Sequence, residues 1–318
     1  GSFGDSTSDE DPGSGGFESC VTKTAAAGAR DVYLVFMFDR SGSMTADASP
    51  KWTSAKAASK AFFESPDAKG VHASLSFFPD QDDYSCDAAA YATPSVAMTA
   101  LPSTALGESL DAQTPNGDTP TRAALAGAID YAQAVASHDG TEGKVAVVLV
   151  TDGLPDSVCD GNSVGAVKDL ASSVASAIPT YVIGVGDQLT SLEEIAAGGG
   201  TKHAFIVDAT SPEQIQQDFR AAIDAIRKLA LACDYEIPPP PAGERLDREK
   251  VNVVYKSAGA TDALAYNPSC TGGTGWRYDD PDAPTRILLC TSSCDAVKTT
   301  QGEMEVLFGC ATRTTAVK

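Results

Sequence analysis

Residues 32–43 read VYLVFMFDRSGS, a nearly continuous apolar run that ends in an aspartate and two serines. An uninterrupted apolar run of this length is typical of a strand that is covered on both faces of its sheet. A second run, VAVVLVT at 145–151, leads into Asp152-Gly153 in the same way. The two segments predict buried strands whose carboxyl ends carry polar side chains.

On either side of these runs, strand-length apolar segments alternate with helical patterns. The predicted strands are 32–38, 71–78, 95–101, 145–150, 180–185 and 204–207, and the predicted helices are 50–64, 121–136, 164–177, 192–197 and 212–231. Alternation of this kind over about two hundred residues predicts an α/β fold, with a doubly wound, mostly parallel, six-stranded sheet and helices on both faces.

Composition divides the chain into four parts. Residues 1–19 are mainly Gly, Ser and acidic residues, which predict a flexible acidic tether. The α/β domain is predicted at 20–233, and four consecutive prolines mark 234–242 as a linker. Beyond it, short strand patterns at 251–256, 276–278, 286–289 and 303–308, separated by Gly, Pro and Asp, predict a small, disulfide-rich, all-β module at 243–318.

The charge balance excludes two classes of partner. The 318 residues include 23 basic and 43 acidic side chains, a net charge of −20. Nucleic acids and anionic membranes are bound through basic faces, so neither is an expected partner. No run approaches the ~18 apolar residues of a membrane span. An acidic tether would suit an N-terminal lipid anchor, which we hold as a hypothesis only.

Cysteine and histidine usage points to an oxidising compartment. The eight cysteines show no CxxC spacing, and the chain has three histidines. Zinc hydrolases and Ser-His-Asp enzymes depend on imidazole, so both classes are disfavoured. Disulfides are the simplest role for the cysteines and predict a secreted or cell-surface protein, with eight free thiols in a cytosolic protein as the alternative.

A cation site is predicted where the strands end. In doubly wound sheets, ligands bind beyond the carboxyl ends of the strands, at the point where the strand order reverses. Asp39, Ser41 and Ser43 follow the first strand, Asp152 follows the strand at 145–150, and the Gly/Pro loop 116–121 opens a helix. Oxygen ligands without His or Cys select Mg²⁺, Mn²⁺ or Ca²⁺.

The D-x-S-x-S motif, the loop threonine and the Asp-Gly pair, in this order, resemble the metal-ion-dependent adhesion site of the von Willebrand factor A family, over about residues 31–231. A secreted or surface protein of bacterial type fits the resemblance. It implies that Ser41 and Ser43 bind the ion directly, and that Asp39 and Asp152 bind it directly or hold its water molecules. The loop threonine corresponds to Thr119, with Thr121 as the alternative.

The resemblance implies a divalent-cation-dependent adhesion or recognition protein whose ion binds an acidic group of a protein or glycan. A second hypothesis is a scaffold subunit of a surface assembly in which the ion only stabilises the loops. The polar residues can also be simple strand-end caps and turn formers. An enzyme is not expected, because an aspartyl-phosphate phosphatase would have a second aspartate where Ser41 stands.

The predicted topology also orders the cysteines. The first strand begins, and the last helix ends, at the edge opposite the cation site, which predicts a bond between Cys20 and Cys233. Cys86 and Cys159 lie in loops at the cation-site edge and are predicted to pair. The remaining predictions, within the C-terminal module, are Cys270–Cys290 and Cys294–Cys310.

Overall fold

The computed structural model forms two compact units, Arg30–Ala232 and a second one from Gly1–Ala29 together with Cys233–Lys318, and each is described by itself. The residues that the structure describes are 21, 23–26, 31–48, 50–80, 84–138, 141, 143–186, 190–207, 211–230, 233–239, 245–257, 260–300 and 303–314.

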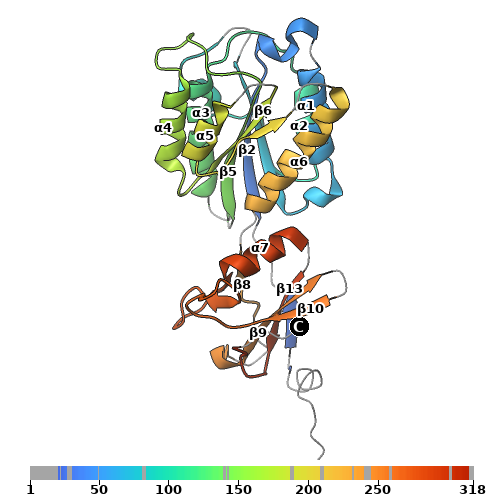
Figure 1. The fold of residues 1–318 in the computed structure, drawn as a ribbon, viewed down its shortest axis with the longest axis vertical. Helices are drawn as coiled ribbons and strands as arrows, with labels where there is room; N and C mark the ends of the chain where they lie inside the picture. Colours follow the sequence, from blue (N-terminus) through green and yellow to red (C-terminus); the bar gives the residue numbers. More distant parts are fainter. Residues whose placement is uncertain are drawn as a thin grey trace, which may run out of the picture. The chain divides into compact units, whose positions relative to one another are not determined.

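The first unit is built on a six-stranded sheet with the order β4-β3-β2-β5-β6-β7 (Figure 1). Its strands are β2 (Val32–Asp39), β3 (Val71–Phe78), β4 (Val96–Ala100), β5 (Lys144–Thr151), β6 (Thr180–Val185) and β7 (Phe205–Val207). All neighbouring pairs are parallel except β3 and β4. The doubly wound, mostly parallel α/β sheet predicted from the sequence is confirmed.

Helices cover both faces of this sheet. They are α1 (Lys51–Phe63), α2 (Ala105–Asp111), α3 (Thr121–Ala136), α4 (Val164–Val174), α5 (Leu192–Gly198) and α6 (Pro212–Ala230). The core residues of α1, α2 and α6 cluster on one face, and those of α3, α4 and α5 on the other (Figure 1). Along β2, Phe36 and Phe38 face the first cluster and Val35 and Met37 the second. This two-sided burial is why β2 is apolar throughout.

The second unit contains two antiparallel sheets. Its strands are β1 (Lys23–Ala26), β8 (Asp234–Glu236), β9 (Val251–Ser257), β10 (Ala260–Leu264), β11 (Trp276–Tyr278), β12 (Arg286–Leu289) and β13 (Glu303–Phe308). One sheet has the order β1-β13-β9-β10 and the other β11-β12-β8. Side chains from both sheets form one apolar core around Trp276, which is fully buried.

Three elements of the second unit depart from the predicted domain organisation. β1 lies in the segment assigned to the α/β domain, yet it pairs with β13. β8 lies in the segment assigned to the linker, yet it pairs with β12. Helix α7 (Thr291–Thr300) adds a helix to the module predicted as all-β. β1 and β8 are short and join sheet edges through backbone hydrogen bonds, which leave little trace in side-chain patterning. The predicted tether, 1–19, lies outside the described residues.

The disulfides follow this arrangement. The bonds Cys86–Cys159 and Cys270–Cys290 are present, as predicted. Cys233 is bonded to Cys294, so the predictions Cys20–Cys233 and Cys294–Cys310 are wrong. The reason is β8, because its pairing with β12 places Cys233 beside the chain that enters α7, and the amide of Leu289 donates to the Cys233 carbonyl at 2.8 Å. Cys310 is also disulfide-bonded, and Cys20 lies outside the described residues.

Within the described part of the chain, no helix combines the length and apolar character needed to cross a membrane.

Candidate functional site

The carboxyl ends of β2 and β5 bring Asp39 and Asp152 to the same edge of the sheet. The two strands are parallel neighbours, with Phe38 opposite Val150. Asp39 ends β2 and is completely buried, and Asp152, just after β5, is 6% exposed. Two carboxylates that are 113 positions apart in the sequence thus meet where the topology predicts a ligand site.

A chain of hydrogen bonds joins the two aspartates. The amide of Ser41 donates to Asp39 Oδ1 at 2.7 Å, and the hydroxyls of Ser41 and Ser43 lie 3.0 Å apart. The hydroxyl of Ser43 then donates to Asp152 Oδ1 at 2.7 Å. On the other side, the Thr151 hydroxyl donates to Asp39 Oδ2 at 2.6 Å. Four of the five predicted ion-site residues therefore form one continuous cluster.

The loop of the fifth residue, Thr119, lies against this cluster. The Gly42 amide donates to the carbonyl of Gly117 at 3.0 Å, and the Asn116 amide donates to the carbonyl of Arg40 at 2.8 Å. Gly117 has a φ of 84°, which a residue with a side chain rarely adopts. The loop thus approaches the D-x-S-x-S segment through its backbone.

Thr119 and Thr121, the two candidates in this loop, differ in their accessibility. The hydroxyl of Thr121 donates to the Thr119 carbonyl at 3.3 Å, and Thr121 is 1% exposed, whereas Thr119 is 8% exposed. The hydroxyl of Thr121 is thus engaged in a local hydrogen bond at the first turn of α3.

Asp156 and Asn162, both in the β5–α4 loop, hold the Thr119 loop in place and were missed in the sequence. Asp156 Oδ2 accepts from the Thr119 amide at 2.6 Å, and Asn162 Nδ2 donates to the Thr119 carbonyl at 2.9 Å. Asn162 Oδ1 accepts from the amide of Arg122 at 2.9 Å. The Cys86–Cys159 bond ties the same loop to the chain after β3. Loop contacts of this kind have no periodicity, so no sequence signal identifies them.

Lys51, the first residue of α1, is the other site residue that the sequence did not reveal. Its Nζ donates to Asp152 Oδ2 at 2.8 Å. Nothing in the local pattern of α1 distinguishes this lysine from Lys56 or Lys60 of the same helix.

The electrostatics of the cluster favour an added cation. Burial, and then the negative charge of Asp152, raise the pKa of Asp39 from 3.8 to about 7, although hydrogen bonds from Ser41 and Thr151 oppose the rise. The raised pKa means that the charged form of Asp39 is disfavoured in its buried position, and a cation beside it would stabilise that form.

The donor set also fits a hard divalent ion, because it consists of carboxylate and hydroxyl oxygens. Among the described residues no group of three or more His, Cys, Asp and Glu side chains could hold a metal, so an ion here would depend on the hydroxyls.

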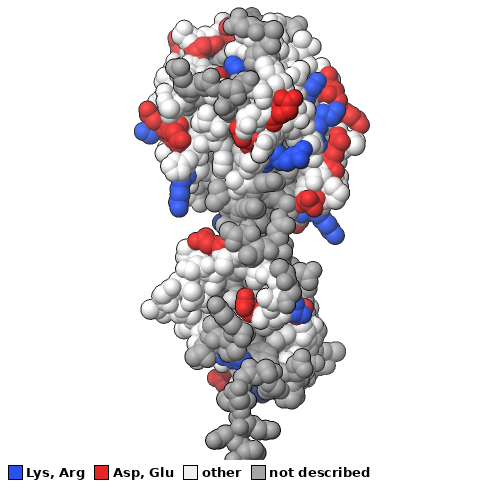
Figure 2. All heavy atoms as spheres, turned by 45° about the vertical axis from the view of Figure 1, so that its right-hand side comes forward, with Lys and Arg blue, Asp and Glu red and all other residues white. Residues whose placement is uncertain are grey.

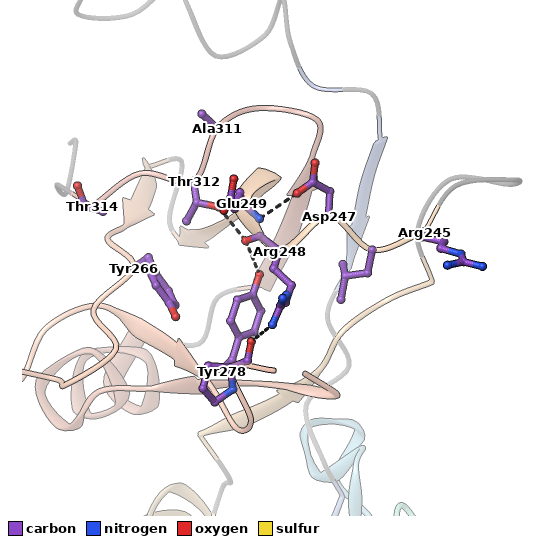
Figure 3. Close-up of a pocket in the computed structure, with 11 residues that line it drawn as sticks. Arg245, Asp247, Arg248, Glu249, Tyr266, Tyr278, Ala311, Thr312 and Thr314 are labelled. Carbon is purple, nitrogen blue, oxygen red and sulfur yellow. Dashed lines mark hydrogen bonds between the residues drawn. The ribbon is translucent and has the colours of Figure 1, made fainter. Parts of the chain in front are cut away.

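A cavity of about 730 Å³ in the second unit does not offer a comparable site (Figure 3). The Tyr278 hydroxyl donates to the carbonyl of Arg248 at 3.1 Å, and the Thr312 hydroxyl to the same carbonyl at 3.3 Å. The Arg248 guanidinium donates to the Pro281 carbonyl. Arg245 points away from the other labelled side chains (Figure 3). These polar groups of the wall are satisfied by one another.

Comparison with solved structures gives similar chains at low identity. They include proximal thread matrix protein 1 of the mussel byssus with a zinc-occupied MIDAS motif (18% identity, 63% of this chain and 47% of that chain covered, TM-score 0.41). They also include the pilus adhesin SpaC of Lactobacillus rhamnosus GG in its open conformation (13% identity, 88% of this chain and 39% of that chain covered, TM-score 0.45). A third is manganese-loaded Plasmodium vivax TRAP (16% identity, 84% of this chain and 95% of that chain covered, TM-score 0.43). The chain thus spans about half the length of the mussel protein. These similarities are too low to carry a function across.

No curated protein matches the chain significantly. The model of the von Willebrand factor type A domain, in contrast, matches residues 34–220, more than half of the 318 residues. The matched range includes all five residues predicted to form the ion site, Asp39, Ser41, Ser43, Thr119 and Asp152. The chain therefore belongs to the von Willebrand factor type A domain family.

Proposed function

We propose that Asp39, Ser41, Ser43, Thr119 and Asp152 form a metal-ion-dependent adhesion site for a divalent cation, Mg²⁺ in the first place and Mn²⁺ or Ca²⁺ as alternatives. The observation that carries the proposal is the hydrogen-bonded chain from Asp39 through both serines to Asp152, with a buried carboxylate whose pKa is raised. A cation held by these oxygens supplies a position at which a foreign carboxylate can bind.

The side chains of the proposed site differ in burial, and this difference suits both holding an ion and exposing it to a partner. Ser41 and Asp39 are buried, so they fix the base of the site, whereas Ser43 is exposed and opens it to solvent. Neutral hydroxyl ligands neutralise none of the charge of a cation, which leaves it attractive to an anion. These features support divalent-cation-dependent adhesion or recognition, with an acidic group on a protein or glycan as the partner.

Disulfides support a location outside the cytoplasm. Three disulfides join described cysteines, and such bonds persist in oxidising compartments. Figure 2 shows basic and acidic side chains interspersed on one face of the first unit. With a net charge of −20, this gives no support to nucleic acid as a partner. We propose a secreted or cell-surface protein, and an N-terminal lipid tether belongs to the same proposal.

We propose no catalytic activity, because Ser41 stands where a phosphatase of the aspartyl-phosphate type would need its second carboxylate.

The proposal is tested by calorimetric titration of the wild type, Asp39→Ala and a control, Asp130→Asn, with Mg²⁺, Mn²⁺ and Ca²⁺. Asp130 lies on the exposed face of α3, outside the ion site. We expect binding to the wild type and the control and a loss of binding in Asp39→Ala. A wild type that binds none of the three ions would overturn the proposal.

A pull-down from surface extract, in Mg²⁺ and then in chelator, separates adhesion from a scaffold role. Adhesion through the ion predicts that capture is lost in chelator and in Asp39→Ala. Capture that survives both, while the ion still binds and raises the melting temperature, would instead support the scaffold alternative.

A further inference from the structure

The ion site contains a cationic side chain of the protein itself. Lys51 Nζ lies 2.8 Å from Asp152 Oδ2, and the side chain of Asp152 is completely enclosed, while that of Lys51 is 22% exposed. The 3-10 helix η1 (Gly42–Ala48) leads from the D-x-S-x-S segment to the start of α1, where Lys51 stands. The ammonium therefore reaches the site from the chain that immediately follows the motif.

The two carboxylates differ in the charge of the groups that donate hydrogen bonds to them. Both oxygens of Asp152 accept hydrogen bonds from side chains, Oδ1 from the Ser43 hydroxyl and Oδ2 from the Lys51 ammonium. Asp39 accepts from the Ser41 amide and the Thr151 hydroxyl, which are both neutral. Among these contacts, Asp152 alone has a full counter-charge.

The formal charges show what Lys51 changes. With both carboxylates ionised, their charge is −2, and the ammonium reduces it to −1. With a divalent cation added, the site has a formal charge of +1, whereas it would be neutral without Lys51. A positive charge near the site repels a cation and attracts an anion, and both effects follow from Coulomb's law.

We propose that Lys51 sets the charge of the ion site: its ammonium weakens the binding of the divalent cation and strengthens the binding of a carboxylate to the cation-loaded site. The inference rests on the proposed function, because it concerns the same site. Lys51 would thereby favour acidic partners through the charge of its ammonium group.

A purely structural role for Lys51 makes a different prediction. Removal of a structural ion pair lowers stability and weakens both kinds of binding, or leaves them unchanged. A charge-setting role moves the two affinities in opposite directions. Opposite signs are therefore the diagnostic result.

The chain offers matched variants. Lys51→Gln removes the charge and keeps most of the side-chain length, and Lys51→Arg retains the charge. Lys56→Gln is the control, because Lys56 lies on the same helix and pairs with Asp111 at 3.3 Å, not with the ion site. The melting temperature of each variant in chelator shows whether it is folded.

The first measurement is calorimetric titration of the four proteins with Mn²⁺ alone. We expect Lys51→Gln to bind Mn²⁺ more tightly than the wild type, on the order of tenfold for one unit charge at a few ångströms in a largely aqueous setting. Lys51→Arg and Lys56→Gln should match the wild type. Equal or weaker Mn²⁺ binding by a folded Lys51→Gln would overturn the inference.

The second measurement uses acetate as the carboxylate probe, with water-proton relaxation by bound Mn²⁺ as the readout of exchangeable water. Acetate should displace water from the Mn²⁺-loaded wild type at a concentration several-fold lower than from Lys51→Gln. Equal acetate sensitivity would contradict the inference. If the wild type binds no Mn²⁺ at all, the proposed ion site itself fails. This outcome differs from a failure of the charge-setting role, in which the wild type binds Mn²⁺ but Lys51→Gln shows no change in affinity or acetate sensitivity.

Discussion

Replacement of Asp39 by asparagine should stabilise the ion-free protein, although it removes a proposed ion ligand. Asp39 is completely buried at the end of β2, and its pKa is raised from 3.8 to about 7, first by burial and then by the charge of Asp152. Its ionisation at neutral pH therefore opposes folding in the absence of a cation. The amide of an asparagine can donate to the Thr151 hydroxyl, which can turn its proton to the carbonyl of Gly153, 3.2 Å away.

The size and sign of the effect follow from linkage. Since the folded-state pKa is higher than the unfolded-state value, the penalty is absent below pH 3.8, grows as the pH rises and is complete above about pH 7. At about 1.4 kcal/mol for each tenfold change, the full penalty is about 4 kcal/mol. For a unit of this size, 1 kcal/mol shifts the melting temperature by about 2–4 °C. Asp39→Asn should thus melt about 10 °C higher than the wild type at pH 8 in chelator.

The assay is thermal unfolding by circular dichroism between pH 5 and 8, in chelator and in Mg²⁺, with Asp130→Asn as the exposed control. In chelator, the wild type and the control should lose stability toward pH 8, whereas Asp39→Asn should change much less. Mg²⁺ should restore the wild type and leave Asp39→Asn unaffected. If Asp39→Asn melts at or below the wild type at pH 8 in chelator, the reasoning about the buried charge is refuted.

Three further predictions concern the frame of the site. The double substitution Cys86→Ser/Cys159→Ser removes a disulfide that spans a sequence separation of 73, and it should lower the free energy of unfolding by about 2–5 kcal/mol. An unchanged urea midpoint would contradict this. Asn162→Ala should weaken Mn²⁺ binding, since it removes the side-chain hydrogen bonds to the Thr119 carbonyl and from the Arg122 amide that hold the Thr119 loop, and equal calorimetric affinities would exclude the role given to Asn162. Gly127→Ala should lower the melting temperature, despite a helix propensity about 1 kcal/mol better, because the added Cβ would lie 2.5 Å from a carbonyl oxygen of the 3-10 helix η3 (Ala88–Tyr91). A raised melting temperature would show that η3 moves aside.

The central sheet could be predicted from the sequence because its signals are local. β2 and β5 are apolar along their whole length, since helices cover both faces of the sheet, and such runs stand out without reference to the fold. Asp39, Ser41, Ser43 and Asp152 follow these runs directly. Once the runs are parallel neighbours, their polar ends must lie together, so four site residues could be placed from topology alone.

The second unit was harder to predict, since backbone pairing decides it. β1 and β8 have four and three residues and join sheet edges in segments assigned to another domain and to a linker. Strands this short carry no readable alternation. The wrong pairing of Cys233 follows from the missed β8, because a cysteine is placed by its neighbouring strand and not by its distance along the chain.

Lys51 shows the same limit at the functional site itself. The motif residues are of the types and spacing that an ion would require, so the sequence identifies them as candidates. Lys51 contacts Asp152 across 101 positions of the chain, and in sequence it is one of three lysines in α1. The proposed ion ligands can therefore be read from a motif, whereas a charge proposed to tune the ion depends on how the surrounding chain is folded. Relatives with the same motif but another residue at this position should consequently differ in cation affinity.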